Sequence, residues 1–80
     1  MKTKEWKKTT QLLEKEYLFA DFKETMRFVN RVAELSEQLN HHPDMYISYH
    51  RLKLSLWTHT TSSVTEKDLQ LADAIDKLES

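Results

Sequence analysis

The stretch DFKETMRFVNRVAELSEQLNHHP, residues 21–43, decides the fold. Its apolar residues recur at the three- and four-residue spacing of a helix with a wide apolar face: Phe22, Met26, Phe28, Val29, Val32, Ala33, Leu35 and Leu39. Asp21 can cap the first turn, and Glu24 can reach back as in a capping box. Asn40 suits the helix C-terminus, and Pro43 prevents continuation. We expect a helix over 22–39, with part of its face packed against another subunit.

Alternating residues on both sides of this helix predict strands. Residues 12–19 form one, with one side made of Leu13, Lys15, Tyr17 and Phe19. Residues 45–49 and 52–58 predict two more, joined by a tight turn near His50-Arg51. In the last strand Leu52, Leu54 and Leu56 point one way, and Lys53, Ser55 and Trp57 the other. Trp6 belongs to a short strand or anchors on the sheet, and residues 1–4 are expected to fray.

A second helix is expected to start at Thr65. Asp68 completes a capping pair with Thr65, and Val64 is placed to pack on Leu69. The expected buried stripe is Leu69, Ala72, Ile75 and Leu78. The order of strands, helix, strands and helix predicts an α+β fold, with an antiparallel sheet and both helices on one face.

The composition limits the class of protein. Eighty residues make a single domain, 1–80, and a core this small makes self-association a reasonable expectation. The chain has no cysteine, so it has neither a disulfide nor a thiolate metal ligand. A net charge of −1 argues against nucleic-acid binding, and no run is long and apolar enough for a membrane span or a signal peptide. We therefore expect a soluble, cytoplasmic protein.

All four histidines, His41, His42, His50 and His59, lie between positions 41 and 59. The imidazole pKa lies near neutrality, so the cluster suggests proton transfer. His41 and His42 follow the helix, whose dipole favours the protonated ring there by about 0.3–1 kcal/mol. His59 stands at a strand end, where side chains are held yet accessible. Glu37, one helical turn before His41, has a carboxylate able to orient a histidine.

Each of these residues also has a simpler interpretation. His41 and His42 fit solvated helix-end positions, and His50 fits an exposed turn. Glu37 fits a surface carboxylate, and Asp68 fits a helix cap alone. Trp57 covers either a pocket or the open face of the sheet. A metal site at His41, His42 and His59 is disfavoured, because adjacent histidines rarely aim at one ion and no i,i+4 histidine pair supports it.

The spacing of these residues resembles the pterin-4a-carbinolamine dehydratase family. The match consists of Glu37-x3-His41-His42-Pro43, then Tyr49 after five residues, His59 after nine more, and Asp68 beyond. Flanking segments agree as well: Phe19-x-Asp21-Phe22, Phe28-Val29-Asn30-Arg31-Val32-Ala33 and Val64-Thr65-x-x-Asp68-x-x-Leu71-Ala72. The resemblance covers about residues 13–78.

The resemblance implies a four-stranded antiparallel sheet with two helices on one face, and the loss of water from 4a-hydroxytetrahydropterin to give quinonoid dihydropterin. This reaction recycles tetrahydropterin for aromatic amino acid hydroxylases. By similarity His41 and His59 are the acid/base residues and His42 is a substrate contact. Glu37 and Asp68 support them, and Pro43 fixes the bend. The resemblance implies a pterin substrate, a homodimer or homotetramer, and no metal or organic cofactor.

This sequence departs from the family pattern in three places. It lacks the usual N-terminal helix before the tryptophan, it has Ser62-Ser63 where glycines are usual, and it has Lys15 where arginine is usual. The alternative function is that of a protein-interaction or dimerisation cofactor, or of an accessory protein in a pterin or molybdopterin pathway, without dehydratase turnover. That role would use the helix face around Phe28, Val32 and Leu35.

Overall fold

The computed structural model describes residues 2–78 of the chain. Its elements, in chain order, are β1 (Lys2–Thr3), β2 (Lys7–Lys8), β3 (Leu13–Leu18), α1 (Phe22–Leu39), β4 (Asp44–Ser48), β5 (Arg51–Leu56) and α2 (Glu66–Leu78). None of the helices in this described part is long and apolar enough to cross a membrane.

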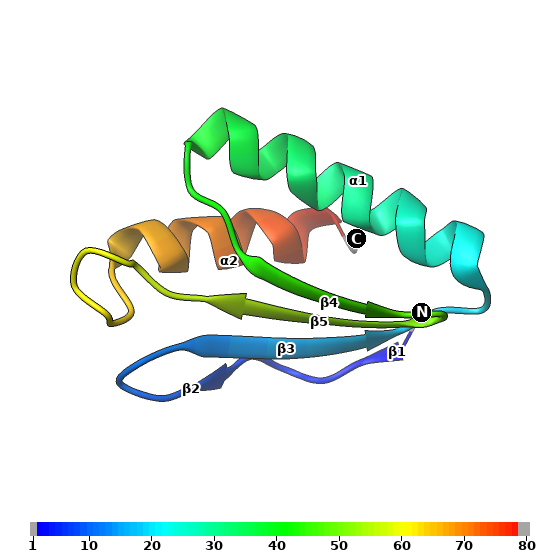
Figure 1. Ribbon diagram of the computed structural model, residues 1–80, viewed down its shortest axis with the longest axis horizontal. Coiled ribbons are helices and arrows are strands. Elements are labelled where there is room, and N and C mark those ends of the chain that lie inside the picture. The colour runs from blue at the N-terminus through cyan, green and yellow to red at the C-terminus, as the bar shows by residue number, and fades with distance from the viewer. Residues whose placement is uncertain (1, 79–80) are drawn as a thin grey trace.

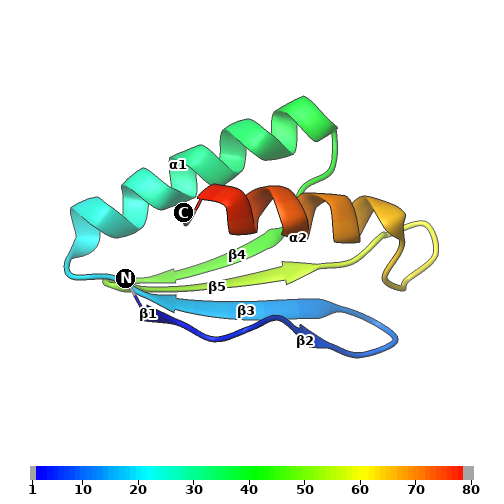
Figure 2. The same cartoon turned by 180° about the vertical axis from the view of Figure 1, so that it is seen from behind.

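The strands form one antiparallel sheet with the order β1-β3-β5-β4. β2 also pairs with β3, whose other edge is taken by β5, so β1 and β2 share one edge as an interrupted strand. The sheet is therefore four strands wide. Both helices cover the same face of it (Figures 1 and 2). The predicted α+β fold is confirmed, and the described residues before β3 form β1 and β2 in place of a helix.

Alternate side chains of the two central strands, β3 and β5, point into the core from one face of the sheet. Leu52, Leu54 and Leu56 of β5 are fully buried, beside Leu13 and Tyr17 of β3. The remaining core side chains come from α1, α2 and the end of β3: Phe19, Phe28, Val29, Val32, Leu71, Ala72 and Ile75. This arrangement agrees with the predicted strand faces.

The first helix begins and ends as its sequence predicts. The Asp21 carboxylate accepts a hydrogen bond from the backbone N–H of Glu24 at 2.9 Å, and the Glu24 carboxylate accepts one from the backbone N–H of Ala20. Asn40 takes a left-handed conformation with φ 52°. The N–H groups of Asn40 and His41 then bond to the carbonyls of Glu37 and Ser36, which is a Schellman motif.

Lys15 lies on the core side of β3 and is only 7% exposed. Its ammonium group lies 2.8 Å from Asp76 Oδ1 in α2, and Trp6 Nε1–H donates to the same oxygen at 2.9 Å. The Lys15 ammonium also lies 5.6 Å from the centre of the Trp6 ring. Trp6 thus anchors the N-terminal segment to α2, whereas the sequence predicted an anchor on the sheet or a short strand; the strand β2 begins directly after it.

The predicted buried stripe of α2 is right for Ala72 and Ile75, which are buried, and for Leu78, which packs against the core, but it is wrong for Leu69. Leu69 is 42% exposed, whereas Leu71 is fully buried. The helix is turned so that Asp68, Leu71, Ala72 and Ile75 face inward, at the spacing i, i+3, i+4 and i+7. The predicted stripe did not include Asp68, which was expected to cap the helix. In the fold, its carboxylate is an inward residue of the stripe.

Other corrections concern the hairpin, the N-terminus and α1. Ser48 pairs with Arg51, so the tight turn is Tyr49-His50 and not His50-Arg51. Lys2 and Thr3 belong to β1, although fraying was predicted there; Met1 lies outside the described residues. Phe28 and Val32 are buried in the core, so they do not form the free interaction face expected of them.

Candidate active site

The three histidines singled out from the sequence line one open pocket of about 390 Å³. The pocket lies where α1 and β5 end and α2 begins, which is the left end of the molecule in Figure 1. Its lining residues are Asn40, His41, His42, Thr58, His59, Thr60 and Lys67. The fourth histidine, His50, is exposed in the β4–β5 turn at the opposite end.

The helix exit directs His41 and His42 to different partners. After the left-handed turn at Asn40, the His41 side chain is 12% exposed and points to α2, whereas the His42 side chain is 56% exposed. Half-buried Pro43 follows and leads directly into β4. Proline restricts its own φ and disfavours helix at the residue before it, so the segment stays extended. The two adjacent histidines therefore occupy separate environments.

Asp68 lies behind His41 and is completely buried. His41 Nε2 lies 2.5 Å from Asp68 Oδ1. The other carboxylate oxygen, Oδ2, accepts a hydrogen bond from Thr58 Oγ1 at 2.8 Å and one from the Thr65 backbone N–H at 2.9 Å. The predicted capping contact of Asp68 with Thr65 is present, together with contacts to β5's extension and to the histidine.

Burial by itself would raise the pKa of Asp68. The hydrogen bonds from His41, Thr65 and Thr58, and the charge of His41, outweigh burial and hold the pKa below its ordinary value of 3.8. Asp68 is therefore a carboxylate at neutral pH and accepts the proton of His41 Nε2–H. Within residues 2–78, the other ring nitrogen, His41 Nδ1, has no hydrogen-bond partner, so it is the nitrogen free to exchange a proton with a ligand.

Glu37 contacts His42 and not His41. Its Oε2 lies 2.6 Å from His42 Nε2, and the two side chains are 78% and 56% exposed. A solvated pair of this kind contributes little to stability, but its hydrogen bond favours one orientation of the imidazole. The carboxylate one turn before the histidines thus orients the second of them.

His59 stacks on Trp57. The ring centres are 3.9 Å apart and the planes are inclined by 13°. Trp57 Nε1–H donates a hydrogen bond to Asp44 Oδ2 at 2.9 Å. Trp57 and Pro43 do not line the pocket. Trp57 instead contacts a residue that does, because its indole stacks on the His59 imidazole.

Four residues that line the pocket were not predicted as site residues: Asn40, Thr58, Thr60 and Lys67. Asp44, which accepts a hydrogen bond from Trp57, was not predicted either. Thr58 contacts both Asp68 Oδ2 and Thr65 Oγ1 through its Oγ1. Its position beside His59 at a strand end was the available signal. No signal in the sequence pointed to Lys67, which is an exposed residue in the first turn of α2. None pointed to Asp44 either, which directly follows the histidine motif.

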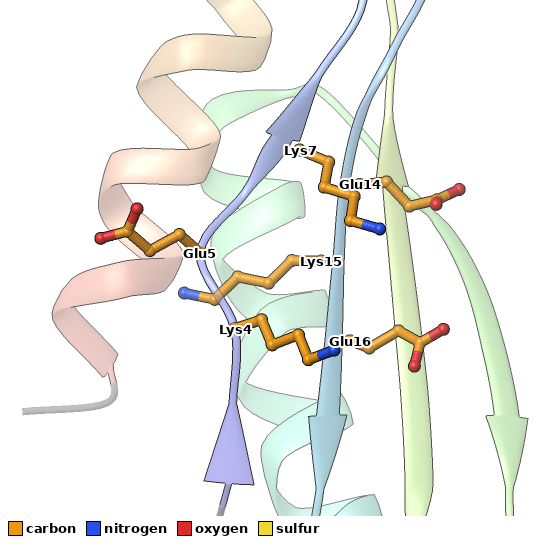
Figure 3. Close-up of a pocket in the computed structure, with 6 residues that line it drawn as sticks. All are labelled: Lys4, Glu5, Lys7, Glu14, Lys15 and Glu16. Atoms are coloured by element: carbon orange, nitrogen blue, oxygen red, sulfur yellow. The ribbon is translucent and has the colours of Figure 1, made fainter.

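A second hollow, of about 150 Å³, lies against β3 and the segment that leads from β1 into β2 (Figure 3). Its lining consists of three lysines and three glutamates: Lys4, Glu5, Lys7, Glu14, Lys15 and Glu16. The Lys15 ammonium group lies 2.8 Å from Asp76 Oδ1 of α2. Opposite charges balance in this hollow, and it contains no histidine. Among the described residues, no group of three histidines or carboxylates is placed to hold a metal ion.

Comparisons with known proteins agree with this geometry. A relative from Thermomicrobium roseum, named for the pterin-4-alpha-carbinolamine dehydratases, is 45% identical over 75 residues, which are 94% of this chain and 81% of that protein. One from Sulfurisphaera tokodaii with the same name is 40% identical over 77 residues, covering 96% and 83%.

Solved structures show the same fold. A transcriptional coactivator/pterin dehydratase from Brucella melitensis superposes with a TM-score of 0.84 at 30% identity, covering 90% of this chain and 79% of that one. A pterin dehydratase-like RuBisCO assembly factor of the alpha-carboxysome gives 0.78 at 23% identity, covering 94% and 89%, and supports the fold alone. The family model described as pterin 4 alpha carbinolamine dehydratase matches residues 1–78, and the chain therefore belongs to that family.

Proposed function

We propose that this protein is a dehydratase that removes water from 4a-hydroxytetrahydropterin and releases quinonoid dihydropterin. The observation that carries the proposal is the meeting of three imidazoles, His41, His42 and His59, on one open pocket. One of them is backed by a buried carboxylate, Asp68. Membership of the family supports the substrate class.

The reaction needs one proton donor and one proton acceptor. The C4a–O bond breaks, the departing hydroxyl takes a proton and leaves as water, and a ring N–H of the pterin loses a proton. Histidines suit both transfers at neutral pH. His41 suits one of them, because Asp68 stabilises a positive charge on its ring while Nδ1 stays free. We assign His59 to the other transfer and His42, oriented by Glu37, to substrate contact.

In this proposal the protons move between protein side chains and substrate, so no metal or organic cofactor takes part. Pro43 keeps the histidine pair on an extended segment that it shares with β4. The product is a dihydropterin that a reductase converts back to tetrahydropterin. The physiological role would be tetrahydropterin recycling for aromatic amino acid hydroxylases.

A kinetic assay of carbinolamine decay tests the proposal. Wild-type protein should accelerate decay above the uncatalysed rate, and His41→Ala or His59→Ala should lower kcat by about 10²–10⁴-fold. His50→Ala is the matched control, because it removes an imidazole at the far end of the molecule and should keep the wild-type rate. If His41→Ala and His59→Ala combined leave the rate unchanged, the assigned roles are wrong.

We also propose that the chain forms a homodimer or homotetramer, using the edge of β4. Ile47 pairs with fully buried Leu52 on the core side of the sheet, yet it is 41% exposed. Its neighbours Tyr46 and Tyr49 are 68% and 65% exposed. The core is thus incomplete at this edge, and a second copy pairing there would extend the sheet and cover Ile47.

Binding of a foreign partner is the second candidate function. The same exposed edge favours it, because aromatic residues are enriched at protein interfaces. A pull-down that recovers a stoichiometric foreign protein, from a preparation that does not turn over carbinolamine, would favour this function over the dehydratase.

A further inference from the structure

The geometry points to Asp44 as a positioning residue for His59, acting through the indole of Trp57. The inference rests on the proposed function, in which the His59 ring exchanges a proton with the substrate. Three contacts carry it: the Asp44–Trp57 hydrogen bond, the Trp57–His59 stack, and the place of His59 in the pocket wall.

The sheet register brings Asp44 and Trp57 together. Asp44 opens β4 and lies opposite Ser55 of β5. Trp57 follows Ser55 by two residues, so it projects from the same face of the extended chain and is a diagonal neighbour of Asp44. Diagonal cross-strand neighbours are within reach of a long aromatic side chain. The indole N–H meets the Asp44 carboxylate at 2.9 Å, which fixes the plane of the ring.

The fixed indole then limits the freedom of His59. His59 is exposed and stands in the turn that follows β5, so neither burial nor regular secondary structure holds its ring. An imidazole without support samples about three χ1 wells and a roughly twofold χ2. The near-parallel stack on Trp57, 3.9 Å away, selects one of these orientations. The contact is an aromatic pair in the stacked range of geometries.

Asp44 also ties His59 to the other two histidines. It stands two residues after His42 and directly after Pro43 on one extended segment. The rigid proline sets the offset between the histidine pair and Asp44. Through Trp57, the Asp44 carboxylate therefore fixes the position of the His59 imidazole relative to the segment that carries His41 and His42. A covering role of Trp57 over the sheet would need no such hydrogen bond at its indole nitrogen.

Two readouts test the inference, one of them independent of activity. The ring protons of His59, identified by their absence in His59→Gln, should show an upfield ring-current shift in the NMR spectrum of the wild-type protein. Asp44→Ala and Trp57→Leu should both remove that shift. In the kinetic assay kcat should fall about three- to sixfold in each, which is the loss expected when the ring samples all its rotamers, with KM little changed.

Conservative and control variants separate positioning from general damage. Asp44→Asn keeps an oxygen that accepts from the indole N–H, so it should retain most of the wild-type kcat and the NMR shift. Trp57→Phe keeps an aromatic ring but loses the N–H that donates to Asp44. The double variant Trp57→Phe/Asp44→Ala should therefore have the same kcat as Trp57→Phe alone. Trp6→Phe is the matched control, since Trp6 donates the same kind of bond, to Asp76 at 2.9 Å, away from the pocket.

The outcomes distinguish this inference from the proposed function. If Asp44→Ala leaves the His59 ring signals unmoved, or moves them without lowering kcat, Asp44 is not a positioning residue. If the wild-type protein turns over no carbinolamine, the proposed function fails, and the NMR shift still decides whether Asp44 positions His59.

Discussion

Asp68 is the side chain on which the contacts of the histidine pocket converge. Its two oxygens receive His41 from the α1 exit, Thr58 from the segment after β5, and the first turn of α2. A buried charge is tolerated only when it is hydrogen-bonded in this way. The same carboxylate thus holds three segments together and assigns the proton of His41 to Nε2.

Loss of this carboxylate should be costly. Asp68→Ala leaves Thr58, the Thr65 N–H and His41 without their buried acceptor, and should lower the free energy of unfolding by about 3–5 kcal/mol. Asp68→Asn keeps one acceptor oxygen and should lower it by about 1–3 kcal/mol. Urea denaturation at pH 7 measures both. Asp73→Ala, on the exposed side of α2, should stay close to the wild-type value; equal effects of Asp73→Ala and Asp68→Ala would refute the structural role.

The lowered pKa of Asp68 also predicts a pH dependence. Above the ordinary value of 3.8, the carboxylate is ionised in both the folded and the unfolded chain, and its stabilisation is complete. As the pH falls below that value, the unfolded chain binds the proton first, so stability is lost until the folded pKa is passed. Unfolding free energies measured from pH 6 to pH 2.5 should fall more steeply below about pH 4 in the wild type than in Asp68→Asn. Parallel curves for the two proteins would contradict the assignment.

At the scale of elements, the connections are built without glycine, which the sequence lacks. Asn40, Tyr49 and Ser62 have φ values of 52°, 53° and 51°, in the left-handed region where a side chain costs about 1–2 kcal/mol. Asn40 is a residue that tolerates this region well, and its role as helix end was predicted. Tyr49 was not expected there, which is why the predicted turn was displaced by one residue.

Ser62→Gly should stabilise the loop between β5 and α2. Relief of the left-handed conformation outweighs the greater freedom that glycine gives the unfolded chain, for a net gain of about 0.5–1 kcal/mol in the free energy of unfolding. Ser63→Gly is the control, because Ser63 has no positive φ, and its hydroxyl donates to Thr61 at 2.9 Å. Thermal or urea unfolding compares the two; stabilisation by Ser63→Gly and not by Ser62→Gly would reverse the argument.

At the scale of the whole molecule, the sheet has two different edges. The β1/β2 edge is anchored to α2 through Trp6, Lys15 and Asp76. The β4 edge carries the half-exposed Ile47 and two exposed tyrosines. An open edge with apolar side chains is a place where sheets associate. The asymmetry supports the proposal that copies of the chain meet at β4.

Ile47→Lys should weaken that association, since an ammonium on an edge strand opposes pairing with another sheet. Size-exclusion chromatography with light scattering should show a shift of the wild-type oligomer toward the mass of one chain. Gln38→Lys adds the same charge on the exposed side of α1 and should leave the mass unchanged. An unchanged mass in Ile47→Lys would exclude this edge as the interface.

The sequence by itself determined where the long elements lie, because caps and apolar periods act over a few residues. The bounds of α1, the buried faces of β3 and β5, and the left-handed Asn40 all follow from such local rules. The approximate site was also accessible, since the three histidines fall near the ends of predicted elements. The inward positions of Asp68 and Leu71 in α2 were not, because Asp68 counts as polar in any periodic pattern while its hydrogen-bond partners make it an inward residue.

Only the tertiary structure decided which side chains meet. Asp68 contacts His41, 27 positions away in the sequence, and Asp44 contacts Trp57, 13 positions away. The Glu37 carboxylate contacts His42 and not His41. These pairings depend on strand register and on how α2 packs beside α1, which no local pattern encodes. Hydrogen bonds need positions correct to a fraction of an ångström, and that precision comes from the packed core as a whole.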